Sequence, residues 1–313
     1  MMESLQVCLN ATVPLFIYLA AGYLARCLGQ IKDEDVFRYN KVVFNFFLTT
    51  NQFKSIYFSD LSTAVRPRLI VFAVGGVLLS CGLGLLLAHR LLPEKRQRGV
   101  MVQGVFRSNF VLIGLYIAAT LVPNETTASV AVLSAVIIPL YNMLAVVVLS
   151  LYSGEKISPR QIFLKVLKNP LIIATALGLL WLSFGPRLPR FMETAITQMS
   201  AVATPMMLFL LGGFFHFDSL PRYKRQVALG TAMKLVVVPG IFLPLAYVLG
   251  FRGMEFAALL GLFASSNAVA SFTMVQQLGG DSELAGDIVV VTNALCPFTL
   301  FGWCLLFKLL GAF

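Results

Sequence analysis

The sequence predicts an all-α membrane protein of about ten transmembrane helices, arranged as two inverted five-helix repeats. Of its 313 residues, 58% are hydrophobic and only 12% are charged, a composition too apolar for a water-soluble domain. At about 20 residues per span, the chain holds roughly ten helices joined by short loops. Two of the apolar stretches also carry polar residues at their centres, and this feature indicates a duplicated, interrupted helix.

The apolar stretches set the positions of the spans. We place them near residues 5–27, 36–57, 69–91, 99–121, 127–152, 170–184, 196–215, 226–249, 255–277 and 284–310. The sixth is short for a full crossing. The second is the least apolar. We expect it inside the bundle, with Lys41 and Lys54 near its ends, where long side chains reach water.

The ninth span carries Ser265, Ser266 and Asn267 at its middle. Polar groups at that depth are costly unless they face a cavity or another helix. Serine and asparagine also bond to the local backbone and cap helices that restart. The stretch therefore predicts a broken helix. An unbroken helix whose polar side chains bond to neighbouring helices is the alternative.

The fourth span repeats the pattern with Arg107, Ser108 and Asn109. The interval from Asn109 to Asn267 recurs in two further pairs, Pro139 with Pro297 and Glu125 with Glu283. Matching residues at helix breaks, helix starts and mid-helix prolines indicate an internal repeat. We expect a first repeat over residues 1–152, a linker over 153–169 and a second repeat over 170–313.

Basic residues predict the orientation of the chain. Fifteen lie at or beyond the ends of the odd-numbered spans: Arg26, Lys32, Arg38, Lys41, Arg90, Lys95, Arg96, Arg98, Lys156, Arg160, Lys165, Lys168, Arg222, Lys224 and Arg225. The opposite side has six: Arg66, Arg68, Arg187, Arg190, Arg252 and Lys308. The basic side is expected to be cytoplasmic, with both termini outside the cell (inner) membrane. Because each half has five spans, an odd number, the second half enters the membrane in the opposite orientation to the first, as in many secondary transporters. Residues 153–169 resemble a short interfacial helix on the cytoplasmic surface.

Other function classes find little support in the composition. The net charge of +10 sits in loops, as expected at a membrane surface rather than for a nucleic-acid partner. The five cysteines have no metal-type spacing. The two histidines, His89 and His216, lie near predicted membrane ends. We expect no cofactor, no metal and no enzymatic activity.

Several stretches carry a resemblance to a known family. They are FRSNFVLIGLYIA (106–118), PLYNMLAV (139–146), KNPLIIATALGLL (168–180), ATPMMLFLLGG (203–213) and ASSNAVASFTMVQQLGGDSELA (264–285). Together they resemble the auxin efflux carrier family, more closely its bacterial members. The resemblance implies broken fourth and ninth helices that cross at mid-membrane and a homodimer in which one bundle moves for alternating access. It also implies organic anions as substrates, such as auxin in plants and malonate or malate in bacteria. Family members often carry proline where this chain has Thr49, Tyr116 and Ser266.

The candidate substrate-binding residues follow from the expected crossing. Half-helix N-termini suit a carboxylate, and the guanidinium of Arg107 suits bidentate carboxylate binding. The alternative for Arg107 is a backbone carbonyl partner or extension to water. The resemblance adds Asn142, and the second span adds Thr50 and Asn51, which bridging between helices would equally explain. The full set is Arg107, Ser108, Asn109, Ser265, Ser266, Asn267, Asn142, Asn51 and Thr50.

Acidic residues are scarce in the spans. Of fourteen Asp and Glu residues, only Asp287 falls clearly within one. Proton and sodium relays usually use a buried carboxylate. We therefore expect a secondary transporter of a small organic anion, a mono- or dicarboxylate or an auxin-like acid, that works by efflux or is driven by membrane potential. A sodium- or proton-coupled symporter, a channel and a non-transporting membrane sensor are the alternatives.

Overall fold

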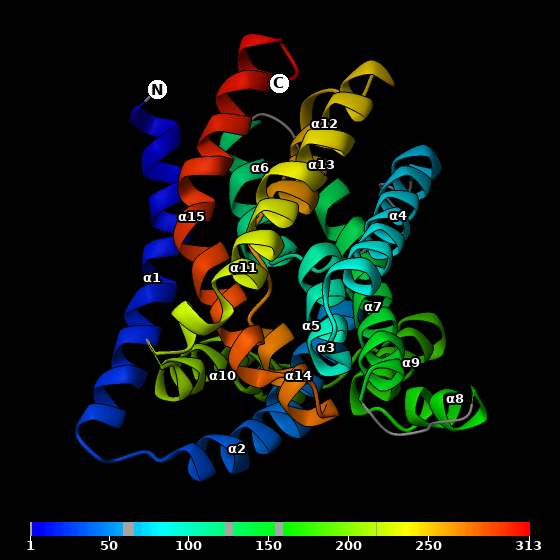
Figure 1. Cartoon of the computed structure of the whole chain (residues 1–313). Coiled ribbons are helices and arrows are strands. Elements are labelled where there is room, and N and C mark those ends of the chain that lie inside the picture. The colour runs from blue at the N-terminus through cyan, green and yellow to red at the C-terminus, as the bar shows by residue number, and fades with distance from the viewer. Residues whose placement is uncertain (1, 59–65, 123–127, 154–158, 217) are drawn as a thin grey trace.

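The computed structural model describes residues 2–58, 66–122, 128–153, 159–216 and 218–313 (Figure 1). The described residues form helices and connecting turns without a strand, which confirms the predicted all-α class. In chain order the helices are α1 (Met2–Cys27), α2 (Asp33–Val42), η1 (Val43–Leu48), α3 (Thr49–Tyr57), α4 (Pro67–Leu91), α5 (Lys95–Phe106), η2 (Phe110–Gly114), α6 (Leu115–Leu121), α7 (Ala128–Leu151), α8 (Pro159–Leu167), α9 (Pro170–Phe184), α10 (Arg190–Phe214), α11 (Ser219–Ala232), η3 (Met233–Val237), α12 (Val238–Val248), α13 (Gly253–Ala264), α14 (Ala270–Leu278) and α15 (Ser282–Leu309). The η segments are short π-helices.

Five helices in the described part of the chain are long and apolar enough to cross a membrane. They cover Pro67–Leu91, Ser129–Leu151, Arg190–Phe214, Ser219–Val248 and Ser282–Leu309. Shorter apolar helices cover Val13–Cys27, Pro170–Phe184 and Gly253–Ala264. Helix length explains only part of the difference from about ten expected spans, because α1 and the path α2–η1–α3 are long enough to cross but are not among the five. A half-helix of 12 residues rises only about 18 Å, against a hydrocarbon core of about 30 Å.

The second predicted span is one helical path, α2–η1–α3, with a π-helical segment at its middle. Val36, Phe44 and Ile56 on this path are buried, whereas the side chain of Phe46 is 60% exposed. The path therefore packs on one face, and the expectation of a helix inside the bundle holds for that face only. A π-helical turn adds a residue to the turn and shifts which side chains face inward after it.

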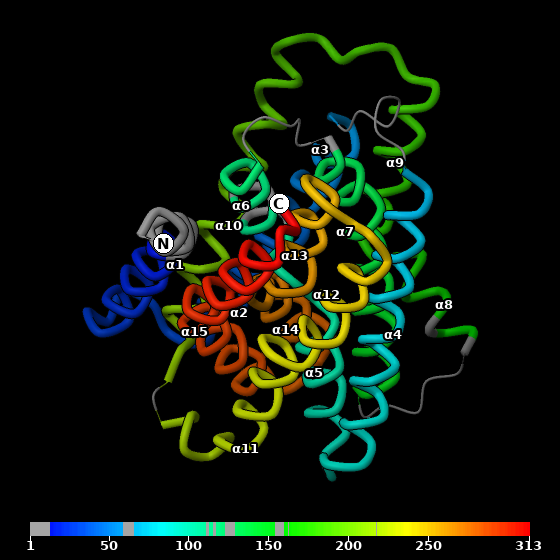
Figure 2. The backbone as a smooth tube through the Cα atoms, turned by 90° about the horizontal axis from the view of Figure 1, so that it is seen from above, coloured from blue at the N-terminus to red at the C-terminus, as the bar shows by residue number. Residues whose placement is uncertain are grey.

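Two long contacts join the halves of the chain. Helix α1 packs along α10, and α3 packs along α9. The start of α1 and the end of α15 lie at one end of the molecule, while α8 lies at the other (Figure 1). Seen from above, α8 is at the edge of the bundle (Figure 2). Two residues of α8, Phe163 and Leu167, expose their apolar side chains.

The fourth and ninth predicted spans are both interrupted in the structure. Helix α5 ends at Phe106, and the backbone of Arg107 is extended (φ −80°, ψ 132°) before η2 begins. Helix α13 ends at Ala264, and Ser265 is extended in the same way (φ −73°, ψ 160°) before α14 begins. The breaks form although serine, not proline, occupies position 266.

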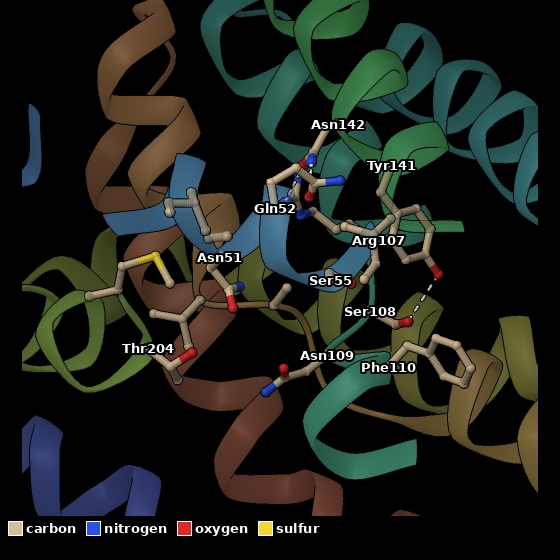
Figure 3. Close-up of a pocket in the computed structure, with 16 residues that line it drawn as sticks. Asn51, Gln52, Ser55, Arg107, Ser108, Asn109, Phe110, Tyr141, Asn142 and Thr204 are labelled. Carbon is tan, nitrogen blue, oxygen red and sulfur yellow. Dashed lines mark hydrogen bonds between the residues drawn. The ribbon is translucent and has the colours of Figure 1, made fainter. Parts of the chain in front are cut away.

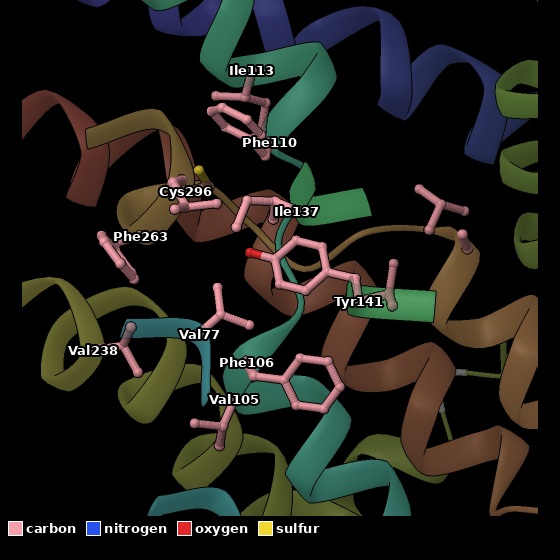
Figure 4. Packing of buried hydrophobic residues seen from close by; sticks show 14 of the residues in the cluster. Val77, Val105, Phe106, Phe110, Ile113, Ile137, Tyr141, Val238, Phe263 and Cys296 are labelled. Carbon is pink, nitrogen blue, oxygen red and sulfur yellow. The ribbon is translucent and has the colours of Figure 1, made fainter. Parts of the chain in front are cut away.

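The two broken helices contact each other directly. The backbone N–H of Asn109 donates to the carbonyl of Ser266 at 2.8 Å. Farther along, a Cβ placed on Gly261 would lie 2.4 Å from the Cα of Gly114, so only glycines allow this approach of α13 to η2. Apolar side chains close the core around the first break, among them the Phe110 ring (Figure 4).

Candidate functional site

A cavity of about 160 Å³ lies beside the two breaks (Figure 3). Its walls come from the second predicted span, the first break, α7, α10 and the start of α14. The lining residues are Leu48, Asn51, Gln52, Ser55, Arg107, Ser108, Asn109, Phe110, Ile138, Tyr141, Asn142, Thr204, Met207, Ala268, Val269 and Ala270. Segments that are distant in sequence therefore contribute polar and apolar side chains to one small cavity.

Arg107 is the charged residue of this cavity. Its side chain is only 5% exposed. One terminal nitrogen, Nη2, donates to Oδ1 of Asn142 at 2.9 Å, and Nη1 lies 2.8 Å from Sδ of Met274. The buried Nε has no hydrogen-bond partner among the described residues. No carboxylate in the described part of the chain forms an ion pair with Arg107. The structure thus places a guanidinium in a buried cavity without a described counter-charge.

A chain of hydrogen bonds holds the guanidinium in place. Nδ2 of Asn142 donates to Oε1 of Gln52 at 2.9 Å, and Nε2 of Gln52 donates to Oγ1 of Thr175 at 3.1 Å. The Thr175 hydroxyl then donates to the carbonyl of Leu171 at 2.8 Å. This chain links the first break to α7, α3 and α9. Hydrogen bonds between buried side chains restrict the positions of the residues that they join.

Two helix beginnings also face the cavity. Asn109 and Phe110 line it where the helical stretch 110–121 starts, and Val269 and Ala270 line it where α14 starts. No side chain caps the N-terminus of α14. The N–H groups of Ser271 and Phe272 in the first turn of α14 donate to the carbonyls of Ala268 and Val269, but the start of a helix still carries a partial positive charge. Both features favour an anion at this position.

The two predicted asparagines have different surroundings. Asn109 lines the cavity, and its buried Nδ2 has no hydrogen-bond partner in the described part of the chain. Asn267 does not line it, because its polar atoms are used in the scaffold. Its Oδ1 accepts from the Ser271 hydroxyl at 2.8 Å, and its backbone carbonyl accepts from Nδ2 of Asn293 at 3.2 Å. Asn267 therefore stabilises the second break.

The hydroxyls of the second break also lie outside the cavity wall. The Ser266 hydroxyl donates to Oδ1 of Asn293 at 2.8 Å. The buried Ser265 hydroxyl has no partner in the structure. The backbone N–H of Asn267 donates to the Thr292 hydroxyl at 3.3 Å. Helix α15 therefore supplies hydrogen-bond partners to Ser266 and Asn267 of this break.

The remaining predicted residues divide between lining and scaffold. Ser108 lines the cavity, with its hydroxyl 2.9 Å from that of Tyr141. Asn51 lines it too, and its Oδ1 accepts from Ser200 at 2.7 Å. Thr50 does not line it, because its hydroxyl donates to the Phe46 carbonyl of its own helix at 2.7 Å.

Sequence reasoning missed several lining residues, above all Gln52, Ser55 and Tyr141. One signal for the first two was available, because Leu48, Gln52 and Ser55 recur at the three- and four-residue spacing of one helix face. Tyr141 is adjacent to Asn142 but carried no signal of its own. As for metals, no group of three or more His, Cys, Asp or Glu side chains comes together among the described residues.

Comparison with known proteins places this chain in a family. The model of the family described as membrane transport protein matches residues 7–304. A protein named uncharacterized transporter, from Methanothermobacter thermautotrophicus, is 22% identical over 299 residues, covering 94% of this chain and 96% of that protein. Auxin efflux carrier component 1 of Arabidopsis thaliana is 24% identical over 151 residues, which are 45% of this chain and 24% of the plant protein.

Proposed function

This chain belongs to the membrane transport protein family, and from that premise we propose that it carries a small organic anion across the cell membrane by alternating access. The observation that supports the anion is Arg107, which is buried in the cavity with no described carboxylate partner. A buried charge needs compensation. A carboxylate substrate supplies it, and the planar guanidinium suits two carboxylate oxygens.

The surroundings of Arg107 support the same ligand class. The uncapped start of α14 and the start of the stretch 110–121 add partial positive charge. The free Nδ2 donor of Asn109 adds a hydrogen bond. The cavity, at about 160 Å³, is well below the roughly 300 Å³ at which pockets for drug-sized ligands begin. A mono- or dicarboxylate of a few carbons, or a flat auxin-like acid, is the matching substrate.

In this proposal the chain forms two inverted five-helix repeats, residues 1–152 and 170–313, whose relative movement opens the site to each side of the membrane in turn. The support is the paired packing of α1 with α10 and of α9 with α3, in which each repeat's first predicted span contacts the other repeat's second. The helix breaks occur at matching places of the two halves. In folds of this kind, one bundle rocks against the other around a fixed site.

The driving force we propose is the membrane potential. No acidic residue is among the described lining of the cavity. Asp287 is buried, and its Oδ1 accepts from the Ser219 hydroxyl at 2.7 Å, away from that lining. An anion that moves without a carboxylate relay carries net charge, so a potential alone moves it.

The test is uptake into liposomes that contain the purified protein. A panel of mono- and dicarboxylates is supplied under an imposed potassium-diffusion potential, with no sodium or pH gradient. Wild type is compared with Arg107→Gln and with the exposed control Arg190→Gln, which removes the same charge from outside the cavity. We expect saturable uptake in wild type and control, and a loss of at least tenfold in Arg107→Gln.

Other results of the uptake experiment would contradict parts of this proposal. Uptake that appears only with a sodium or pH gradient would replace the potential-driven carrier with a coupled symporter. Flux that does not saturate would indicate a channel. A compound that binds without being moved would indicate a sensor. Equal uptake by wild type and Arg107→Gln would exclude Arg107 as the anion-binding residue.

A further inference from the structure

A second cavity, here named the α8 pocket, opens at the end of the molecule where α8 lies. Its volume is about 1140 Å³. It is lined by Lys41, Phe44, Asn45, Arg96, Ser150, Ser153, Gln161, Leu164, Lys165, Lys168, Asn169, Pro170, Gln277, Leu278 and Gly279. None of these residues lines the cavity beside the helix breaks. The α8 pocket is therefore a separate site.

The charged side chains in the described lining of the α8 pocket are all basic. Lys41, Arg96, Lys165 and Lys168 contribute to the lining, and no acidic residue is among the described lining residues. Within the described part of the chain, no side-chain hydrogen bond or ion pair involves Lys41, Arg96 or Lys168. These three come from α2, α5 and the turn before α9. Cations gathered from separate elements around one cavity raise the local concentration of anions.

Buried donors without partners complete the pocket. Among the described residues, neither the hydroxyl of Ser150, a residue only 1% exposed, nor the buried Nε2 of Gln277 has a hydrogen-bond partner. Buried polar groups are nearly always bonded, so such exceptions call for an explanation. Hydroxyl and amide donors in a cavity that is also lined by cations suit a ligand with several acceptor oxygens, which is the chemistry of a phosphate group.

Helix α8 supplies an apolar surface next to this polar pocket. The side chains of Phe163, Leu164 and Leu167 are 62%, 41% and 51% exposed, and Leu164 also lines the pocket. The helix lies at the edge of the bundle (Figure 2). An amphipathic helix with such a face lies in the interface of the bilayer. A pocket lined by basic side chains and an exposed apolar surface thus lie side by side.

We propose that the α8 pocket binds the phosphate of an anionic phospholipid, with the acyl chains against the exposed face of α8. Basic pockets between membrane helices bind such headgroups, and each lysine or arginine near the surface contributes about fivefold in affinity. The lipid holds α2, α5 and α9 together at one point. Phosphate itself also exists in soluble esters, and the experiment separates the two sources.

The experiment measures binding to the purified full-length protein in neutral detergent by native mass spectrometry. The probes are short-chain phosphatidylglycerol, phosphatidylcholine with the same chains, and sn-glycerol 3-phosphate. The test variant is Arg96→Gln with Lys168→Gln. The control is Arg190→Gln with Lys308→Gln, which removes one arginine and one lysine at exposed positions that line neither cavity.

We expect phosphatidylglycerol to bind more tightly than phosphatidylcholine, and its affinity to fall by at least tenfold in the test variant but not in the control. Glycerol phosphate binding as tightly as phosphatidylglycerol, with the same sensitivity, would keep the phosphate site but overturn the lipid as its source. Equal affinity of both variants for phosphatidylglycerol would overturn the site. Displacement of bound phosphatidylglycerol by malonate would also overturn it, because the pocket would then be a vestibule for carboxylates.

Discussion

The backbone N–H of Asn109 donates a hydrogen bond to the carbonyl of Ser266 at 2.8 Å. The two residues lie in different halves of the chain, and each stands where a helix is interrupted. Backbone groups freed by a break inside a membrane must find partners, because no bulk water is available there. Each break therefore helps to satisfy the other, and the cavity lies beside the place where the two breaks meet.

Asn293 on α15 is predicted to be essential for the stability of the second break. Its side chain accepts from the Ser266 hydroxyl and donates to the Asn267 carbonyl. Asn293→Leu leaves both groups buried without this partner, at a cost of about 1–3 kcal/mol for each. We expect a lower midpoint of thermal unfolding in detergent. Thr299→Val serves as control, because this half-buried residue of the same helix bonds only to carbonyls of its own helix, and an equal midpoint for both variants would contradict the prediction.

The close approach of α13 and η2 predicts a strict requirement for glycine. In Gly261→Ala the new methyl group would lie 2.4 Å from the Cα of Gly114, so the two backbones must separate. Overpacking of this kind costs about 1–3 kcal/mol. Gly75→Ala on α4 is the matched control, because a Cβ there meets nothing within 4 Å. We expect a lower unfolding midpoint and slower uptake for Gly261→Ala only, and unchanged behaviour of both variants would argue against a tight crossing.

Asn142 and Gln52 are predicted to act as a unit in positioning Arg107. Nδ2 of Asn142 donates to Gln52, while its Oδ1 accepts from Arg107. Each single change to alanine should raise the substrate concentration at half-maximal uptake, because the guanidinium loses its fixed position. The effects of substitutions within one hydrogen-bond network are not additive. The double variant should therefore have a half-maximal concentration only slightly above that of the more affected single variant. Fully additive effects in this double-mutant cycle would contradict the coupling.

Asp287 is predicted to be dispensable for coupling. Asp287→Asn keeps an oxygen that accepts from the Ser219 hydroxyl, so the local contact with α11 persists. We expect potential-driven uptake and its pH profile to remain within about twofold of wild type, because the carboxylate lies outside the described lining of the cavity. A proton requirement that is present in wild type and absent from Asp287→Asn would contradict the proposed driving force.

Much of the fold was predictable because composition controls it. Apolar stretches of membrane length fix where helices form, and the sixth predicted span, 170–184, coincides with α9. The break at Ser265 and Asn267 was also predictable, because three polar residues at the centre of an apolar stretch need partners. The first break, at residues 107–109, was predictable as well, because its Ser-Asn pair repeats that of the second break.

The lining of the cavity was less predictable, and the second span shows why. Thr50, Asn51 and Gln52 are consecutive, and successive helical residues differ by about 100° in direction. The π-helical segment η1, which ends at Leu48, changes that phase. The sequence pointed to Thr50 and Asn51, whereas the structure directs Asn51 and Gln52 into the cavity and bonds Thr50 to its own helix.

The sequence by itself determined the helices, the interruption of two of them and the presence of one arginine at a break. Each of these follows from local hydropathy and from the cost of a polar group in hydrocarbon. Only the tertiary structure decided that Asn109 pairs with Ser266, that Asn142 and Gln52 hold Arg107, and that Asn267 belongs to the scaffold. Those assignments depend on contacts between segments far apart in the chain, and no local pattern of residues encodes them.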